Sequence, residues 1–300
     1  MSEMTIRAIA LDIDGTLLNS KHELTPEVEK ALRDAANQHV QIILATGKSR
    51  NSAVHLIKHL KLETYGIYLQ GTAIYDASGK ITHQKTLDPD LLRRVITYVD
   101  DRDFSVIAYS GTRILARSVN ADMSESTTKY HEPVPEAIGA LQNVVGTLPI
   151  NKIMMIGEPR AITALRWQLN IQLGGAARLV QAGLSNMLEM LPLGSGKGPA
   201  LATLLQDLKI SPAEVMAVGD AENDIEMLQL VGVGVAMGQA EQIVKDAAVH
   251  VTASNDDHGV ARAIEKFVIR QQPSPAPAVE DAATTVIRLT PPANASGEHS

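Results

Sequence analysis

The sequence contains no cysteine, which excludes disulfide bonds, thiolate metal ligands and cysteine nucleophiles. Aromatic residues make up only 3% of the 300 residues, so the core must be mostly aliphatic. No apolar run reaches the roughly 18 residues that a transmembrane helix needs. The N-terminal residues also lack the charged and apolar segments of a secretory signal. We therefore expect a cytoplasmic protein that does not cross a membrane.

Basic stripes are also missing, and the formal net charge is −7. This balance argues against binding to nucleic acid or to anionic membranes. The nine histidines show no HxH or HExxH spacing, which argues against a zinc site. The remaining composition, 45% hydrophobic and 20% charged, is typical of a globular chain with one or two domains. We expect a small-molecule partner and a monomer or homodimer.

Apolar runs alternate with helical spacings at both ends of the chain. Strands are predicted at residues 6–13, 40–45, 66–69, 215–218, 234–236 and 249–251, and helices at residues 26–39, 49–60, 199–209, 223–231 and 260–269. Thr25 before Pro26 suits a helix N-cap followed by proline at the first helical position. This order is typical of a parallel sheet covered by helices.

The middle of the chain has a more mixed order. Strands are predicted at residues 104–109, 113–116, 152–156, 178–181 and 186–190, and helices at residues 89–101, 134–139 and 159–173. Trp167 on the last of these helices is expected to pack within this part of the chain and not to serve as a platform for substrate. We predict an α/β protein: a doubly wound parallel-sheet, Rossmann-like core from residues 1–82 and 191–270, with an inserted α+β cap domain at residues 83–190.

Residues 271–300 hold five of the 14 prolines together with many alanines. This composition predicts a disordered tail. Residues 284–289 are the one part of it that could pair as an edge strand or bind a partner.

The stretch ALDIDGTLLNS places Asp12 and Asp14 directly after the apolar run of residues 6–11, at the carboxyl end of the first predicted strand. Ligands gather beyond the carboxyl ends of strands in an open parallel sheet. Side chains two residues apart on an extended segment point the same way, so both acids can face one crevice. Two such carboxylates repel each other, and a hard cation such as Mg²⁺ would relieve the repulsion.

A second acidic cluster follows another predicted strand, in the stretch VMAVGDAENDIEM. Asp220, Asn223 and Asp224 fall at i, i+3 and i+4, which brings them together at the start of a predicted helix. The two acidic clusters should then share one metal across neighbouring strands.

Other residues fit phosphate chemistry. Thr46 and Gly47 offer a hydroxyl and a backbone N–H beyond a strand end, and Lys197 opens a helix after a glycine-rich turn. We therefore predict that Asp12 attacks a phosphate monoester, forming an aspartyl-phosphate. Asp14 would protonate the leaving oxygen and then activate water.

The segments DIDGTLL, ATG at residues 45–47, SGKG and GDAENDIEM resemble the four motifs of the haloacid dehalogenase-like phosphatases. The GDxxND form and the long insert resemble the Cof-type subgroup, which has a large α/β cap. The resemblance implies Mg²⁺-dependent hydrolysis of sugar phosphates or phosphorylated cofactors. It implies these roles: catalytic Asp12, Asp14 and Lys197; phosphate-binding Thr46, Gly47, Lys197 and Asn223; metal-binding Asp12, Asp14 (through its carbonyl), Asp220 and Asp224. Asn255 would approach the site.

Two positions depart from the subgroup pattern. Lys48 stands where arginine is usual after Thr-Gly, which removes a bidentate phosphate contact. Gln70-Gly71-Thr72 stands in place of Asn-Gly-Ala after the third strand. Neither departure touches the acids, but both bear on substrate fit.

Two other functions remain open. A phosphomutase of the same superfamily would return the phosphoryl group to a sugar, although the stretch after the first motif leaves no room for the smaller cap that such mutases tend to carry. A catalytically silent binding or regulatory protein is the second, and the intact acids argue against it. Taken singly, each acid suits a turn or a helix N-terminus, and Lys197 suits a solvated surface.

Overall fold

The computed structural model describes residues 5–61, 64–129, 131–181, 184–269 and 287–288. The chain divides into two compact units. The first contains the described residues up to Gly47, His55–Thr82 and the described residues from Gly196 onward. The second contains Lys48–Val54 and His83–Ser195.

The first unit is built on an eight-stranded sheet in the order β15-β14-β13-β1-β3-β4-β5-β6. Its strands are β1 (Ala8–Leu11), β3 (Gln41–Ala45), β4 (Thr64–Tyr68), β5 (Ala73–Tyr75), β6 (Ile81–Gln84), β13 (Val215–Gly219), β14 (Val233–Ala236) and β15 (His250–Val251). Neighbours from β15 through to β4 run parallel, and β5 is antiparallel to β4. This confirms the predicted doubly wound α/β core.

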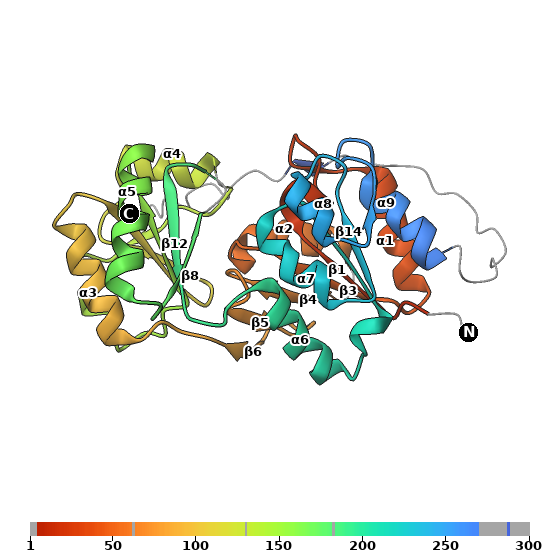
Figure 1. Cartoon of the computed structure of the whole chain (residues 1–300), viewed down its shortest axis with the longest axis horizontal. Helices are drawn as coiled ribbons and strands as arrows, with labels where there is room; N and C mark the ends of the chain where they lie inside the picture. Colours follow the sequence, from red (N-terminus) through yellow and green to blue (C-terminus); the bar gives the residue numbers. More distant parts are fainter. Residues whose placement is uncertain (1–4, 62–63, 130, 182–183, 270–286, 289–300) are drawn as a thin grey trace, which may run out of the picture. The chain divides into compact units, whose positions relative to one another are not determined.

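Alternate side chains of the central strands point to opposite faces of this sheet. Ala8 and Ala10 belong to the cluster that packs beneath α6 (Lys197–Leu208), α7 (Ile225–Leu230) and α8 (Gln242–Ala247). Helices α1 (Pro26–Asn37) and α9 (Gly259–Ile264) contact each other (Figure 1). Because helices and apolar side chains cover the central strands, polar groups can gather at their carboxyl ends.

The start of α1 differs in one respect from the prediction. Thr25 holds the N-cap position and Pro26 the first helical position, but the Thr25 hydroxyl makes no capping hydrogen bond. Instead, Thr25 Oγ1 lies 3.0 Å from His258 Nδ1, next to the first residue of α9. The hydroxyl therefore joins two helices instead of closing one.

The second unit is built on a six-stranded sheet in the order β11-β12-β10-β7-β8-β9. Its elements are α2 (Arg50–Leu60, shared with the first unit), α3 (Pro89–Asp100), β7 (Ser105–Ser110), β8 (Arg113–Ala116), α4 (Ala121–Lys129), β9 (Glu136–Ala137), β10 (Lys152–Ile156), α5 (Pro159–Leu173), β11 (Arg178–Gln181) and β12 (Met187–Leu191). Helices α3 and α5 lie on one face of this sheet (Figure 1) and supply much of its apolar core.

Two expectations for this unit are wrong, and one of its helices was not predicted. Residues 134–139 hold the short strand β9 instead of a helix. Helix α4 was not predicted, because its sequence ADMSESTTK has few apolar residues to mark a helical period. Trp167 is 68% exposed, since Leu165 and Leu169 supply the buried side of α5.

Most of the predicted tail, residues 271–300, lies outside the described residues. Ile287–Arg288 forms the short strand β16, which pairs antiparallel with β2 (Glu23–Leu24). Within the described part of the chain, no helix combines the length and the hydropathy that crossing a membrane requires.

Candidate active site

Asp12 directly follows the central strand β1. Its backbone is extended, and its N–H donates to the carbonyl oxygen of Val218 on β13 at 3.1 Å. Leu11 pairs with Val218, so β1 and β13 end side by side. Asp12 is only 5% exposed, which places a carboxylate at the buried edge of the sheet.

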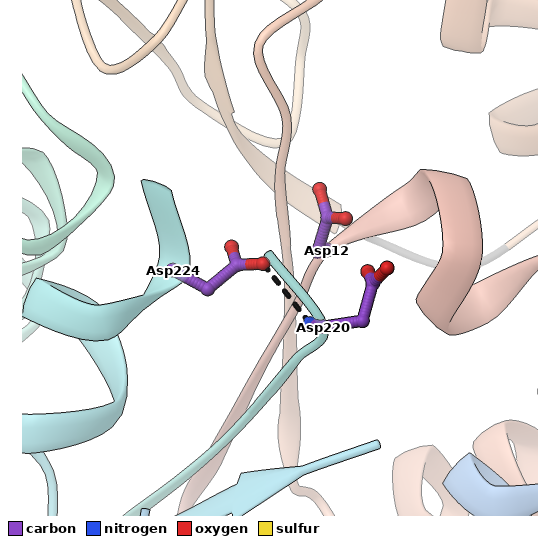
Figure 2. A group of neighbouring side chains, drawn as sticks. All are labelled: Asp12, Asp220 and Asp224. Atoms are coloured by element: carbon purple, nitrogen blue, oxygen red, sulfur yellow. Dashed lines mark hydrogen bonds between the residues drawn. The ribbon is translucent and has the colours of Figure 1, made fainter. Parts of the chain in front are cut away.

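The acids that follow β13 lie beside Asp12. One carboxylate oxygen from each of Asp12, Asp220 and Asp224 falls within 4.8 Å of the others (Figure 2). Asp12 and Asp220 are more than 200 residues apart in the sequence, and the parallel pairing of β1 with β13 brings them together. Hard oxygen donors in this arrangement are the ligands that Mg²⁺ takes in proteins.

The position of Asp220 depends on the turn after Asp12. Thr16 Oγ1 donates to Asp220 Oδ1 at 2.8 Å. Gly15 has a φ of +75°, and a Cβ on it would lie 2.4 Å from Asp220 Oδ2. The glycine therefore permits both the left-handed turn and the approach of the carboxylate.

Lys197 is the first residue of α6 and is fully buried. Its Nζ donates to Asp12 Oδ1 at 2.6 Å and to Asp224 Oδ1 at 2.7 Å. Burial acts to lower the pKa of Lys197, but the two carboxylates outweigh it and raise that pKa above its usual value. The ammonium therefore stays charged between two acids.

Asp224 serves its own loop as well as Lys197. Its Oδ2 accepts hydrogen bonds from the backbone N–H groups of Asp220 and Ala221, both at 3.1 Å. The helix predicted from residue 223 starts only at Ile225, because Glu222–Asp224 forms a 3₁₀ turn. The turn brings the Asp224 carboxylate back over the end of β13 (Figure 2).

The acidic group carries an excess of negative charge. Burial is the main reason that the pKa of Asp12 lies well above its usual range, and Asp224 and Asp220 add to the effect while Lys197 opposes it. Burial likewise raises the pKa of Asp220 to about 6, although the hydrogen bond from Thr16 opposes the rise. Three carboxylates around one ammonium fit a divalent cation, which would favour their ionised forms.

The Asp14 carboxylate is not part of this group. It is half-buried, and its Oδ1 lies 3.4 Å from His22 Nδ1. It is nevertheless close enough to raise the pKa of Asp12. A partly exposed acid beside a buried one suits proton transfer better than metal binding.

Thr46, Gly47 and Asn223, which are predicted to bind phosphate, follow β3 and β13, the two strands on either side of β1. Thr46 and Gly47 follow β3 and are buried, and Thr46 N–H donates to the carbonyl oxygen of Ile67 on β4 at 2.8 Å. Asn223 Nδ2 donates to Gln70 Oε1 at 3.0 Å. Lys48 is buried, at 7% exposure, and belongs to the second unit.

Asn255 contacts residues next to the acidic group and not the acids themselves. Its Nδ2 donates to the carbonyl oxygen of Leu18 at 3.0 Å, and its backbone N–H donates to Gln239 Oε1 at 3.1 Å. Asn255 therefore steadies the chain that follows the Asp12–Asp14 turn.

Three supporting residues had no assigned role in the sequence. Thr16 lies within the DGT motif, and a hydroxyl two residues after Asp14 could have indicated a role in the site. His22 and Gln239 carried no signal, because their partners are fixed by loop conformation: His22 adopts a left-handed φ of 57° beside Asp14. Gln239 Nε2 donates to the carbonyl oxygen of Gly15 at 2.5 Å.

Known proteins resemble this chain over most of its length. The haloacid dehalogenase-like hydrolase family matches residues 9–264. A 5-amino-6-(5-phospho-D-ribitylamino)uracil phosphatase of Bacillus subtilis is 28% identical over 267 residues, covering 89% of this chain and 98% of that protein. A crystal structure of a haloacid dehalogenase-like hydrolase from Bacteroides thetaiotaomicron superposes with a TM-score of 0.81 at 27% identity, covering 87% of this chain and 99% of the other.

One similar protein is much longer. The protein named endoribonuclease YBEY, chloroplastic, of Arabidopsis thaliana is 35% identical over 269 residues, which cover 86% of this chain. The aligned region spans only 46% of the length of that plant protein.

Proposed function

Because the chain belongs to the haloacid dehalogenase-like hydrolase family, we propose that it hydrolyses small phosphate monoesters through a phosphoryl group carried on Asp12. The observation that carries this proposal is the position of the Asp12 carboxylate. It is buried at the end of β1, hydrogen-bonded to Lys197, and within 4.8 Å of acids from the end of β13. Such a carboxylate can serve as a nucleophile in a water-poor site.

The reaction has two displacements at phosphorus. In the first, an Asp12 oxygen bonds to phosphorus while the bond to the ester oxygen breaks, and the Asp14 carboxyl group gives that oxygen its proton. In the second, the Asp14 carboxylate takes a proton from water, and the water oxygen displaces Asp12 from phosphorus. Inorganic phosphate leaves, and both aspartates return to their starting forms. Lys197 holds Asp12 in place throughout.

The residues that would hold Mg²⁺ are Asp12, Asp220 and the main-chain carbonyl of Asp14, with Asp224 supporting them. When bound, the cation would reduce the repulsion between the anionic phosphoryl group and the Asp12 carboxylate. Asp224 supports this set by fixing the backbone of Asp220 and the ammonium of Lys197.

Sugar phosphates and phosphorylated cofactors are the substrates that we propose. The Bacillus subtilis relative is named for a phosphoribityl substrate, which combines a polyol phosphate with a nitrogen heterocycle. The inserted unit is an addition to a minimal α/β core. We propose that this unit selects which leaving group the substrate carries.

A phosphate-release screen tests the proposal. The protein would be incubated with a panel of sugar phosphates and phosphorylated cofactors, with Mg²⁺ and with a chelator, beside the Asp12→Asn variant. Release of phosphate that requires both Mg²⁺ and Asp12 supports the proposal. Isomerised product without free phosphate would instead show a mutase, and no turnover of any monoester would contradict an enzymatic role.

A further inference from the structure

Two consecutive residues at the end of β4 adopt a backbone conformation that side chains rarely take. Leu69 and Gln70 have φ values of +54° and +58°, and Gly71 follows at +80°. Leu69 is fully buried and Gln70 is 5% exposed. Left-handed leucine and glutamine persist only where the surroundings fix them, and such positions concentrate at functional sites.

The Gln70 side chain lies against the phosphate-side turn after β3. A Cβ on Gly47 would lie 2.4 Å from Gln70 Nε2 and 2.8 Å from its Cδ, so the amide covers the Gly47 backbone. The Gln70 backbone N–H also donates to the carbonyl oxygen of Thr46 at 3.3 Å. Both the main chain and the side chain of Gln70 therefore face the Thr46–Gly47 turn.

The other end of the Gln70 amide holds Asn223. Gln70 Oε1 accepts from Asn223 Nδ2 at 3.0 Å. Asn223 Oδ1 is buried and has no hydrogen-bond partner among the described residues. The hydrogen bond from Nδ2 sets the orientation of the Asn223 amide, and with it the direction in which Oδ1 points.

From this geometry we infer that Gln70 is a positioning residue of the active site, whose single amide ties Asn223 to the Thr46–Gly47 turn. The inference rests on the proposed function, because only there do the turn and Asn223 bind the phosphoryl end of a substrate. It also explains the departure from the asparagine expected at this position. A side chain one methylene shorter would withdraw its amide from Gly47 or from Asn223.

Gln70→Met tests the inference because methionine has a similar length but lacks the amide. We expect kcat/KM for the best monoester of the screen to fall about tenfold, with most of the change in KM, as for the loss of one oriented hydrogen-bonding group. Asn223→Ala should cause a similar loss. In the double variant the loss should be no larger than that of the worse single variant, because Gln70 acts through Asn223.

Gln38→Met, a half-buried glutamine at the end of α1, is the matched control and should leave kcat/KM unchanged. Gln70→Asn provides a second variant, because asparagine tolerates the left-handed conformation and should keep the melting temperature. It should still lose several-fold in kcat/KM. Unchanged kinetics in both Gln70 variants, or losses that multiply in the double variant, would overturn the inference.

Phosphate binding separates this inference from the proposed function. Calorimetric titration of the protein with inorganic phosphate in Mg²⁺ needs no turnover. Weaker binding by Gln70→Met, about tenfold, supports the positioning role even if no substrate of the screen is hydrolysed. Equal phosphate binding by wild type and Gln70→Met would count against it, whatever the screen shows.

Discussion

Lys197 Nζ donates a hydrogen bond to Asp12 Oδ1 at 2.6 Å, although the two residues are 185 positions apart in the sequence. The same ammonium donates to Asp224 Oδ1 at 2.7 Å. All three side chains are buried, so each charge depends on the others for compensation. These ion pairs therefore contribute to the stability of the first unit as well as to its chemistry.

Lys197→Met should destabilise the protein and stop turnover. It removes the ammonium and leaves the buried Asp12 and Asp224 carboxylates next to each other and to Asp220 without that compensating charge, which costs about 3–5 kcal/mol at neutral pH. The loss should shrink near pH 5, because burial and mutual repulsion already raise the pKa of Asp12 and favour its neutral form. Urea unfolding at pH 7.5 and pH 5 measures both values, and an equal loss at the two pH values would contradict this electrostatic account.

Asp12→Asn should separate catalysis from folding. The amide oxygen can still accept from Lys197, while the nucleophilic carboxylate is gone. We expect phosphate release to fall by more than about 10⁴-fold, as for the loss of other nucleophiles. Thermal unfolding should show a fold at least as stable as wild type, since one buried negative charge is removed. A near-normal rate would exclude Asp12 as the nucleophile.

The order of strands and helices in the core, and the convergence of its acids, follow from simple rules. Short apolar runs followed by helical spacings imply parallel strands, and the carboxyl ends of parallel strands share one edge. Because Asp12 and Asp220 each follow such a run, their proximity was predictable without knowing any loop.

The supporting residues were not predictable, because their positions depend on loop conformation. Nothing in the sequence marks the left-handed φ of Leu69 and Gln70, or the reach of Gln70 to Asn223. Helix α4 was not predicted for a different reason. Its serines and threonines are poor helix formers, so its tertiary surroundings decide its conformation.

Metal binding should depend on pH through Asp220. Its pKa of about 6 in the folded protein lies above its ordinary value of 3.8, so the folded state binds more protons than the unfolded state between these values. Without metal, wild type should therefore lose stability relative to Asp220→Asn as the pH rises through this window. A cation must displace the Asp220 proton, and its apparent affinity should fall about tenfold per pH unit below 6.

Thermal unfolding at pH 5 to 8, with Mg²⁺ and with chelator, measures this linkage. The stabilisation by Mg²⁺ should be larger at pH 8 than at pH 5. Asp220→Asn should show little stabilisation at any pH. The same Mg²⁺-dependent shift at pH 5 and pH 8 would show that Asp220 does not bind the ion.

The second unit holds its own buried ion pair. Lys152 donates to Glu189 from the neighbouring strand, and both side chains are fully buried. The Lys152 Nζ also lies 4.5 Å from the centre of the Tyr109 ring. Lys152→Met should cost about 3–5 kcal/mol, because it removes the ammonium that Glu189 faces.

A double variant distinguishes a charge effect from a packing effect at this pair. Lys152→Met with Glu189→Leu should recover most of the stability, because an apolar pair avoids the desolvation of both charges. Urea unfolding of the three variants gives the comparison. A double variant that is as unstable as Lys152→Met alone would show that packing, and not charge, sets the loss.

Gly15→Ala should damage the site, whereas Gly139→Ala should only destabilise its loop. Both glycines have a φ near +75°, so alanine at either position pays about 1–2 kcal/mol for the left-handed conformation. At Gly139 the new methyl group meets nothing within 4 Å, but at Gly15 it would lie 2.4 Å from Asp220 Oδ2. The Asp220 carboxylate must then move away from Asp12, and displacement of an active-site group by about 1 Å can cost about 10²-fold in rate.

Phosphate release and Mg²⁺-dependent thermal shifts should therefore fall in Gly15→Ala and remain normal in Gly139→Ala. Equal activity of the two variants would show that Asp220 tolerates the displacement and that the close approach at Gly15 does not position the acid.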